Sequence, residues 1–181
     1  MEYHRPVLYH ESVDALALKP EGVYVDVTFG GGGHSALIAS KLTSGKLYSF
    51  DQDRDAEEQS KKIESPAFQF VRANFRDLKK YLRLYGVKQV DGILADLGVS
   101  SHQFNVPERG FSTRFEGPLD MRMNAEAGTT AKEILETYSE EQLHRIFGIY
   151  GEVKNARTLA RTIVEKRARK PFETINDFKQ A

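Results

Sequence analysis

Apolar positions in the first half of the chain follow two alternating patterns. Short continuous apolar runs, typical of buried strands, are separated by stretches in which apolar residues recur at helical spacing. The runs predict strands at 23–29, 46–50, 68–71 and 90–97, and the stretches between them predict helices at 35–42, 53–63 and 78–85. Strands that alternate with short helices indicate βαβ crossovers, so we expect an α/β fold with a Rossmann-like parallel sheet.

The pattern changes after residue 97. Residues 98–128 carry glycines, prolines and polar residues without a clear period, which predicts a long functional loop or lid. Helical spacing returns at 131–138, 140–150 and 154–170, and Thr174 to Asp177 has the form that starts another helix. We therefore divide the chain into an α/β domain at 1–105, a lid at 106–128 and an inserted helical segment at 129–181. Because the sequence stops soon after the last helix start, we expect a truncated chain.

Composition bounds the class of protein. The chain has 181 residues, 40% of them apolar, a formal net charge of zero and no cysteine. These values fit a soluble globular protein in a reducing compartment and exclude disulfides and thiolate metal sites. The N-terminus lacks the apolar core of a signal peptide, and no apolar run is long enough to span a membrane. We expect a cytoplasmic protein.

Four consecutive glycines follow the first predicted strand, in DVTFGGGGHS at 26–35. A glycine-rich turn between a parallel strand and a helix suits a nucleotide-like ligand, because its backbone amides and the helix N-terminus bind acceptor groups. A flexible turn is the competing interpretation, although glycine in regular structure costs roughly 0.5–1 kcal/mol relative to alanine. The run raises the question of what approaches this backbone so closely that it excludes a Cβ.

The residues around the glycines favour S-adenosylmethionine over NAD as the ligand. Counted from Gly30, a G-x-G-x-x-G dinucleotide fingerprint needs its third glycine where Ser35 stands. The negative charge of Asp26, at the end of the first strand, would repel a pyrophosphate but attract a ligand that carries an ammonium or sulfonium. Asp51, at the end of the second, can accept two ribose hydroxyls, with a solvated strand end as the alternative. S-adenosylmethionine carries both a cationic amino-acid end and a free ribose, whereas NAD lacks the first.

The third and fourth predicted strands also end on candidate residues. Asn74 and Phe75 close the third, where an adenine can lie against the phenyl ring. Asp96 closes the fourth, which in a sheet of order 3-2-1-4 lies beside the first strand, next to the switch point where ligands bind. Asp96 is therefore placed to face both a donor and an acceptor. A carboxylate that only caps the following turn is the alternative.

Together these residues resemble one family, the small-subunit ribosomal RNA (cytosine-N4)-methyltransferases of subfamily H. The resemblance runs through nearly the whole chain, and DLGVSS, RGFS and GPLDMRM, in this order and at these spacings, are its most specific segments. The matching segments are HRPVL at 4–8, DVTFGGGGHS at 26–35, FDQD at 50–53, ANF at 73–75, DGILADLGVSSHQF at 91–104, ERGFS at 108–112, GPLDMRM at 117–123 and YGE at 150–152.

The resemblance implies an S-adenosylmethionine-dependent enzyme with a class I methyltransferase fold. It implies methylation of the exocyclic N4 of a cytidine in small-subunit (16S) ribosomal RNA, with this RNA or the assembled small subunit as partner. It makes 129–181 the start of an inserted RNA-recognition domain. The cofactor-binding residues that it implies are Gly32, Gly33, His34, Asp51, Phe75, Asp96 and Gln103.

The sequence also departs from the family pattern. Family members continue beyond the inserted domain and return to the sheet with a motif resembling SFHSLED, which is absent here. The predicted sheet is therefore incomplete, and its apolar fourth strand either pairs with a second copy, giving a homodimer, or is covered by residues outside this sequence. Two other function classes stay open: a non-catalytic fragment that binds S-adenosylmethionine or RNA without turnover, and an NAD-type oxidoreductase, which Ser35 and Asp26 disfavour.

Asp96 is the predicted catalytic residue. The N4 of cytosine is a poor nucleophile because its lone pair is delocalised into the ring. An acceptor that holds an N–H and takes the departing proton therefore assists methyl transfer, and carbonyls of the turn at 97–100 can contribute. A role for Asp96 in donor binding alone is an equal alternative.

Basic residues mark a candidate RNA surface in the second half of the chain. Residues 154–170 carry seven basic side chains and one acidic side chain, which suits phosphate contacts, although a solvated helix face explains such a run equally well. Arg109, Phe111 and Arg122 of the predicted lid are expected to border the target base. The five histidines suggest no metal site, since only His4 and His10 lie close together.

Overall fold

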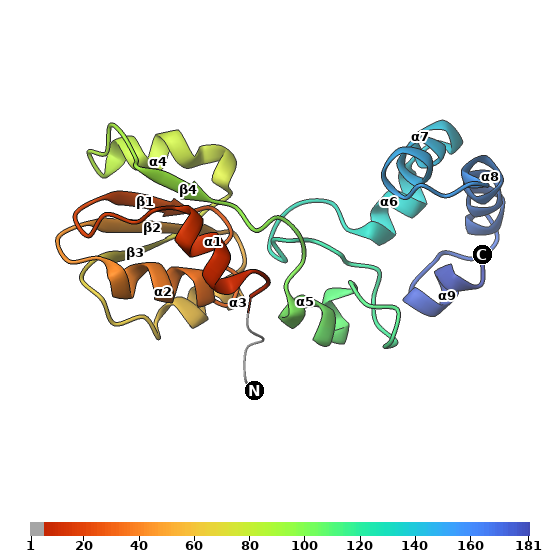
Figure 1. The fold of residues 1–181 in the computed structure, drawn as a ribbon. Coiled ribbons are helices and arrows are strands. Elements are labelled where there is room, and N and C mark those ends of the chain that lie inside the picture. Colours follow the sequence, from red (N-terminus) through yellow and green to blue (C-terminus); the bar gives the residue numbers. More distant parts are fainter. Residues whose placement is uncertain (1–5) are drawn as a thin grey trace. The chain divides into compact units, whose positions relative to one another are not determined.

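The computed structural model describes residues 6–181, which divide into two compact units, one up to His102 and one from Gln103 (Figure 1). The HRPVL segment begins at His4 and Arg5, which lie outside the described residues. Within 6–181 no helix is long and apolar enough to cross a membrane. In the same range no group of three or more histidine, aspartate or glutamate side chains is arranged to hold a metal ion.

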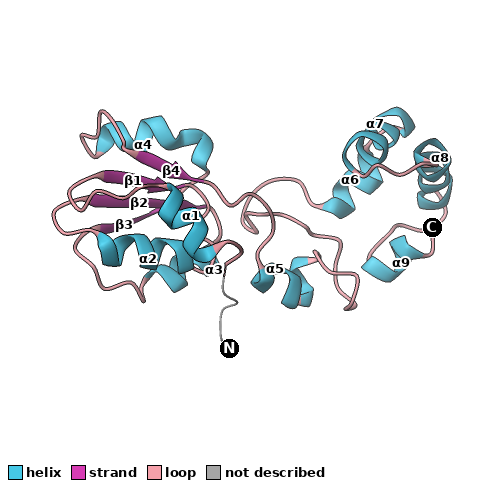
Figure 2. Cartoon of the chain, in the orientation of Figure 1, coloured by secondary structure: helices cyan, strands magenta, loops and turns pink. Residues whose placement is uncertain are grey.

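The first unit is built on a parallel four-stranded sheet (Figure 2). Its order, β3-β2-β1-β4, confirms the order expected from the sequence. In register, Asp26 at the end of β1 lies opposite Ser49 of β2 on one side and Leu94 of β4 on the other. The strands are β1 (Val23–Asp26), β2 (Lys46–Asp51), β3 (Phe68–Arg72) and β4 (Gly92–Leu94).

Helices cover both faces of this sheet. Successive side chains of a strand point to opposite faces, and here both faces carry apolar side chains that the helices bury. Tyr24 packs with α1 and α2 through Val13 and Ile38, whereas Val25 belongs to the cluster that Leu82 of α4 joins. The predicted helices are confirmed within a few residues at each end, but α1 was not predicted. The helices are α1 (Tyr9–Ala15), α2 (Gly33–Lys41), α3 (Arg54–Ser60), the 3₁₀ turn η1 (Phe75–Asp77) and α4 (Leu78–Leu84).

The second unit is helical and has its own core. Leu143, Ala160 and Ile163 are fully buried there and pack with Leu119 and Phe172. Its elements are α5 (Ser101–Asn105), which begins in the first unit, η2 (Pro107–Arg109), α6 (Ala131–Thr137), α7 (Glu140–Arg145), the π-helical turn η3 (Ile146–Tyr150), α8 (Ala156–Arg167) and α9 (Ile175–Lys179).

Capping boxes set the starts of three of these helices. Thr130, Ser139 and Thr174 each accept a hydrogen bond from the backbone three residues on, and the side chain at that position bonds back to the cap amide. The box at Thr174 confirms the helix start predicted at this residue. Because each box satisfies two amides that have no partner inside the helix, short helices such as α9 gain a defined start.

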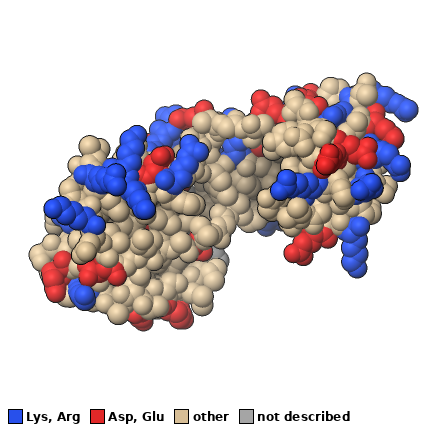
Figure 3. Space-filling view, turned by 90° about the horizontal axis from the view of Figure 1, so that it is seen from above, with Lys and Arg blue, Asp and Glu red and all other residues tan. Residues whose placement is uncertain are grey.

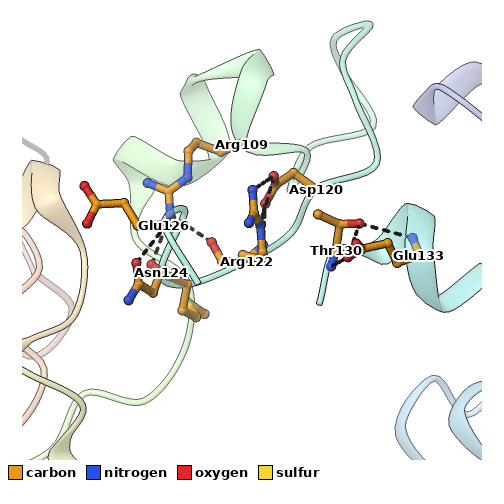
Figure 4. A network of polar contacts seen from close by, with 8 residues as sticks. Arg109, Asp120, Arg122, Asn124, Glu126, Thr130 and Glu133 are labelled. Atoms are coloured by element: carbon orange, nitrogen blue, oxygen red, sulfur yellow. Dashed lines mark hydrogen bonds and ion pairs between the residues drawn. The ribbon is translucent and has the colours of Figure 1, made fainter. Parts of the chain in front are cut away.

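The segment predicted as a loop, 98–128, is mostly irregular but is held by specific contacts. Gly110 has a φ of 72°, and a Cβ there would stand 2.5 Å from the Pro118 carbonyl oxygen. Arg109 donates through Nη2 to the backbone carbonyls of Arg122, at 3.0 Å, and Met123, at 3.3 Å (Figure 4). This network gives the segment a fixed conformation without regular secondary structure.

Candidate functional site

The carboxyl ends of the strands gather most of the predicted site residues at one edge of the sheet in the first unit. The glycine turn follows β1, Asp51 ends β2, Phe75 follows β3, and Asp96 lies two residues beyond β4. Parallel strands place their carboxyl ends together, so residues far apart in sequence become neighbours.

Asp51 ties the glycine turn to β2. Its Oδ2 accepts a hydrogen bond from the Gly30 amide at 2.9 Å, and its Oδ1 accepts one from the Asp53 amide at 2.9 Å. Burial raises the pKa of this carboxyl, and the two amides partly offset that shift. Each carboxylate oxygen has a second lone pair, so Asp51 keeps capacity for further donors such as hydroxyl groups.

Two of the four glycines are required by the protein itself. A Cβ on Gly32, where φ is 81°, would stand 2.5 Å from the Phe29 ring, and a Cβ on Gly33 would stand 2.5 Å from Cγ of Pro6. The crowding that excludes a Cβ at these positions therefore comes from the chain's own side chains and is not evidence of a ligand. Gly30 differs, since it has a φ of 54° with no side chain near its Cβ position.

Asp26 is a structural residue. Its side chain is 1% exposed and accepts hydrogen bonds from Ser35 Oγ at 2.7 Å and from the Thr28 amide at 3.0 Å. Burial raises the pKa of this carboxyl. The expectation that Asp26 faces the cation of a ligand is corrected by this geometry, because its carboxylate is enclosed by α2 and the turn.

A chain of hydrogen bonds leads from Asp26 to Asp96. Thr28 Oγ1 contacts Asp26 Oδ1 at 3.3 Å and accepts from the Asp96 amide at 2.7 Å. Asp96 itself is exposed, so its backbone is anchored while its carboxylate faces solvent. Thr28 was not predicted from the sequence, although its position in the turn immediately after β1 is a signal for such a contact.

Phe75 offers an exposed ring beside the strand ends. Its side chain is 46% exposed, and the preceding Asn74 caps η1 by accepting from the Arg76 amide at 2.9 Å. Asn74 also donates to Gln52 Oε1 at 3.1 Å and so links the loops after β2 and β3. An exposed aromatic ring on an ordered loop is suited to stacking against a planar base.

His34 carries a buried nitrogen without a hydrogen bond. The side chain is 5% exposed and stacks on Tyr9, with ring centroids 5.9 Å apart. Its Nε2 has no hydrogen-bond partner among the residues that the structure describes. An unsatisfied buried polar atom is costly, so this nitrogen is a candidate for bonding to a group that the protein binds.

Gln103 belongs to the second unit. It lies in α5, is buried, and its Nε2 is 3.6 Å from the sulfur of Met123. Its expected contact with a methyl donor therefore remains a prediction.

The arginines expected at the target base have structural partners. Arg109 is buried, and besides the two carbonyls its guanidinium lies 5.9 Å from the centre of the Phe111 ring. Arg122 forms a two-pronged ion pair with Asp120, with Nη2 to Oδ2 at 2.6 Å, and this pairing lowers the pKa of the Asp120 carboxyl (Figure 4). These side chains shape the predicted lid.

The basic run on α8 divides into structural and free side chains. Arg167 donates to the carbonyls of Leu135 and Tyr138 at 2.6 and 2.7 Å. Lys166 donates to the Gln180 carbonyl at 2.8 Å, and Lys170 forms an ion pair with Asp177 at 3.0 Å. The run is therefore not one continuous phosphate surface, which was one of the two interpretations that the sequence left open. The exposed basic side chains left for a ligand are Lys154, Arg157, Arg161 and Arg169.

Comparison with known proteins gives consistent matches. The family model described as the MraW methylase family matches residues 1–181. A ribosomal RNA small subunit methyltransferase H from Cytophaga hutchinsonii is 56% identical over 97% of this chain and 59% of its own length. The protein of the same name from Christiangramia forsetii is 59% identical over 98% of this chain and 60% of its own length.

A solved rRNA methylase from Streptococcus thermophilus is 28% identical, covers 44% of this chain and 51% of its own, and has a TM-score of 0.37. The chain spans about three fifths of the length of the curated relatives that it matches. The family model covers every residue of the chain. The chain therefore belongs to the MraW methylase family.

Proposed function

We propose that the carboxyl edge of the sheet binds S-adenosylmethionine and that the chain acts in methylation of the N4 amino group of a cytidine in small-subunit ribosomal RNA. The observation that carries the proposal is the meeting of the glycine turn, Asp51, Phe75 and Asp96 at one sheet edge, in a chain whose relatives carry the name ribosomal RNA small subunit methyltransferase H. We expect this activity in the cytoplasm.

Each part of S-adenosylmethionine has a suitable residue at this edge of the sheet. Asp51 has unused lone pairs for ribose hydroxyls, the exposed ring of Phe75 suits an adenine, and the open backbone at Gly30 allows close approach. The unsatisfied Nε2 of His34 adds a polar group beside the turn. Asp96 supplies an exposed carboxylate for a cationic ligand.

Asp96 is also the group suited to assist the reaction. S-adenosylmethionine supplies a methyl group on a sulfonium, which becomes a neutral thioether when N4 takes the methyl. A carboxylate at Asp96 accepts a hydrogen bond from one N–H of the amine and so makes the N4 lone pair more available for attack on the methyl group. The same carboxylate receives the proton that N4 must lose. Because Thr28 anchors its backbone amide, Asp96 begins from a defined position.

The second unit supplies a candidate surface for the RNA. Lys154, Arg157 and Arg161 are exposed, and the two arginines lie one helical turn apart on α8. Tyr150, at the end of η3, is 79% exposed and offers a ring for stacking on an unpaired base. We propose phosphate contacts from these side chains.

A second candidate function is donor or RNA binding without turnover. It is favoured by β4, which is an edge strand of the described sheet, and by the exposure of Ile93 on this strand and of Leu97 after it. If the RNA base is held at Asp96 only when further strands lie beside β4, the chain binds the methyl donor without transferring its methyl group.

Two measurements test the proposal. Calorimetry should detect binding of S-adenosylmethionine and of its demethylated product, but not of NAD, and a preference for NAD would refute the assignment of the site. Transfer of tritium from labelled donor to small ribosomal subunits then separates the enzyme from the binding fragment. In a longer relative, Asp96→Asn at the matching position should lose most of the transfer while an Asp91→Asn change should not.

A further inference from the structure

Helix α4 and the residues on either side of it carry a cluster of basic side chains that lies outside both the candidate donor site and α8. Figure 3 looks onto this side of the first unit and shows lysine and arginine side chains gathered on it. Residues 76–88 contain five basic side chains and one acidic side chain, whereas the rest of residues 6–102 contain seven basic and twelve acidic ones. Charge in the first unit is therefore segregated toward α4. The basic members are Lys79, Lys80 and Arg83 on α4, Arg76 on η1 and Lys88 beyond the end of α4.

The cluster lies on the outward face of α4. Leu78, Tyr81 and Leu82 of this helix pack against the sheet, and the basic residues between them are exposed. Lys79 and Arg83 lie one turn apart on this helix, and Arg76 lies just before it in η1. The packing of the apolar side of the helix therefore holds the cations in one row facing solvent.

These cations are little neutralised by the protein. Within the described residues, the ion pair in this cluster is a contact of 3.7 Å between Arg76 and Asp77. Other lysines of the unit have closer acidic partners, for example Lys19 with Asp91 at 3.1 Å and Lys61 with Glu58 at 2.7 Å. A bound polyanion reduces the repulsion between neighbouring cations, and its binding is favoured further by the release of its counterions.

We propose that the outward face of α4 binds the phosphodiester backbone of the RNA substrate. The inference rests on the proposed function, since it adds an RNA contact on the unit that carries the donor site. A row of long basic side chains that face solvent suits the regularly spaced charges of a phosphate backbone, so α4 contributes affinity and orientation without reading sequence. An acidic protein surface is the competing ligand.

The test uses the full chain and a fluorescein-labelled RNA hairpin, with anisotropy measured from 50 to 200 mM salt. The double variant Lys79→Ala, Arg83→Ala should bind more weakly at low salt and should lower the slope of log K against log salt by about 1.4–1.8, which corresponds to two lost phosphate contacts. The matched control is Lys61→Ala, Lys62→Ala, which removes the same charge from the end of α3 and should leave the slope unchanged.

Three outcomes overturn the proposal: a slope equal to that of the control, no binding of the hairpin by the unaltered chain, or equal binding of a labelled polyglutamate with the same loss in the α4 variant. Calorimetry with S-adenosylmethionine on the same samples separates this failure from that of the proposed function. Unchanged donor affinity with an unchanged RNA slope rejects α4 alone, whereas absent donor binding rejects the donor site.

Discussion

The amide of Gly30 donates a hydrogen bond of 2.9 Å to Oδ2 of Asp51, so the turn after β1 and the end of β2 form one unit. A ligand that uses the Asp51 carboxylate therefore meets a group whose position is already set. The same bond makes Asp51 both a structural anchor and a candidate ligand residue, and experiments on it must separate the two.

The first prediction concerns donor affinity. Asp51→Ala should weaken binding of S-adenosylmethionine by roughly 1.5–3 kcal/mol, the range for hydrogen bonds to a charged group, which is about 10- to 150-fold. Calorimetry measures it, with Glu58→Ala, an exposed acidic residue of α3, as the control. A thermal melt of the unliganded variant reports the loss of the Gly30 bond separately. Unchanged affinity would refute the role of Asp51 in binding.

The second prediction concerns pH. Burial raises the pKa of Asp26 above its unfolded value, so the folded chain holds this proton more tightly than the unfolded chain does. The stability that the group contributes is fully present below its unfolded pKa and is lost as the pH rises through its raised folded pKa. Asp26→Asn, which cannot ionise, should flatten this part of the profile of melting temperature against pH.

The control for this experiment is Asp14→Asn, since Asp14 is exposed on α1. An Asp26→Asn profile that parallels the wild type across the acidic range would show that another group carries the dependence.

The third prediction separates the two reasons for glycine. Gly32 and Gly86 both have positive φ, 81° and 74°, but only the Cβ at Gly32 meets another group, the Phe29 ring. Gly86→Ala should cost about 1 kcal/mol from backbone strain, and Gly32→Ala should cost clearly more because the buried ring must move. Chemical denaturation measures both. Equal costs would mean that Phe29 yields easily and that the turn tolerates a side chain.

The fourth prediction tests the division of the α8 cations. Arg167→Ala leaves the carbonyls of Leu135 and Tyr138 without their donor and should destabilise the second unit by about 1.5–3 kcal/mol. Arg161→Ala, on the exposed face, should change stability by less than about 0.5 kcal/mol but should weaken RNA binding. If both variants melt alike, Arg167 is not a structural residue.

The fifth prediction concerns self-association. In the described sheet β4 is paired with β1 on one side, and Ile93 on it is 49% exposed, a combination that favours pairing with another strand. We expect the 181-residue chain to form a homodimer as its concentration rises, measured by sedimentation. Ile93→Lys should weaken association, with Leu84→Lys on α4 as control. A monomer at all concentrations would reject the homodimer.

Local patterns in the sequence were sufficient for most of the fold. The parallel α/β architecture follows from apolar runs separated by helical stretches, and the helix start at Thr174 follows from a capping residue that acts within one turn. Helix α1 was missed because it is seven residues long, buries Val13 as its one fully buried side chain, and begins after Leu8 in a left-handed conformation. None of these features produces a strong periodic signal.

The sequence by itself determined that Asp51, Phe75 and Asp96 lie at or shortly after the ends of strands, and hence that they meet at one edge of a parallel sheet. The tertiary structure decided what each side chain does there. In the folded chain Asp26 is buried and bonded to Ser35, and Phe29 and Pro6 occupy the space that a side chain at Gly32 or Gly33 would need. Arg167 bonds to backbone carbonyls, unlike the exposed basic residues of α8. Chain spacing specifies position along an element, whereas burial and hydrogen-bond partners depend on segments that are distant in sequence and meet only in the folded protein.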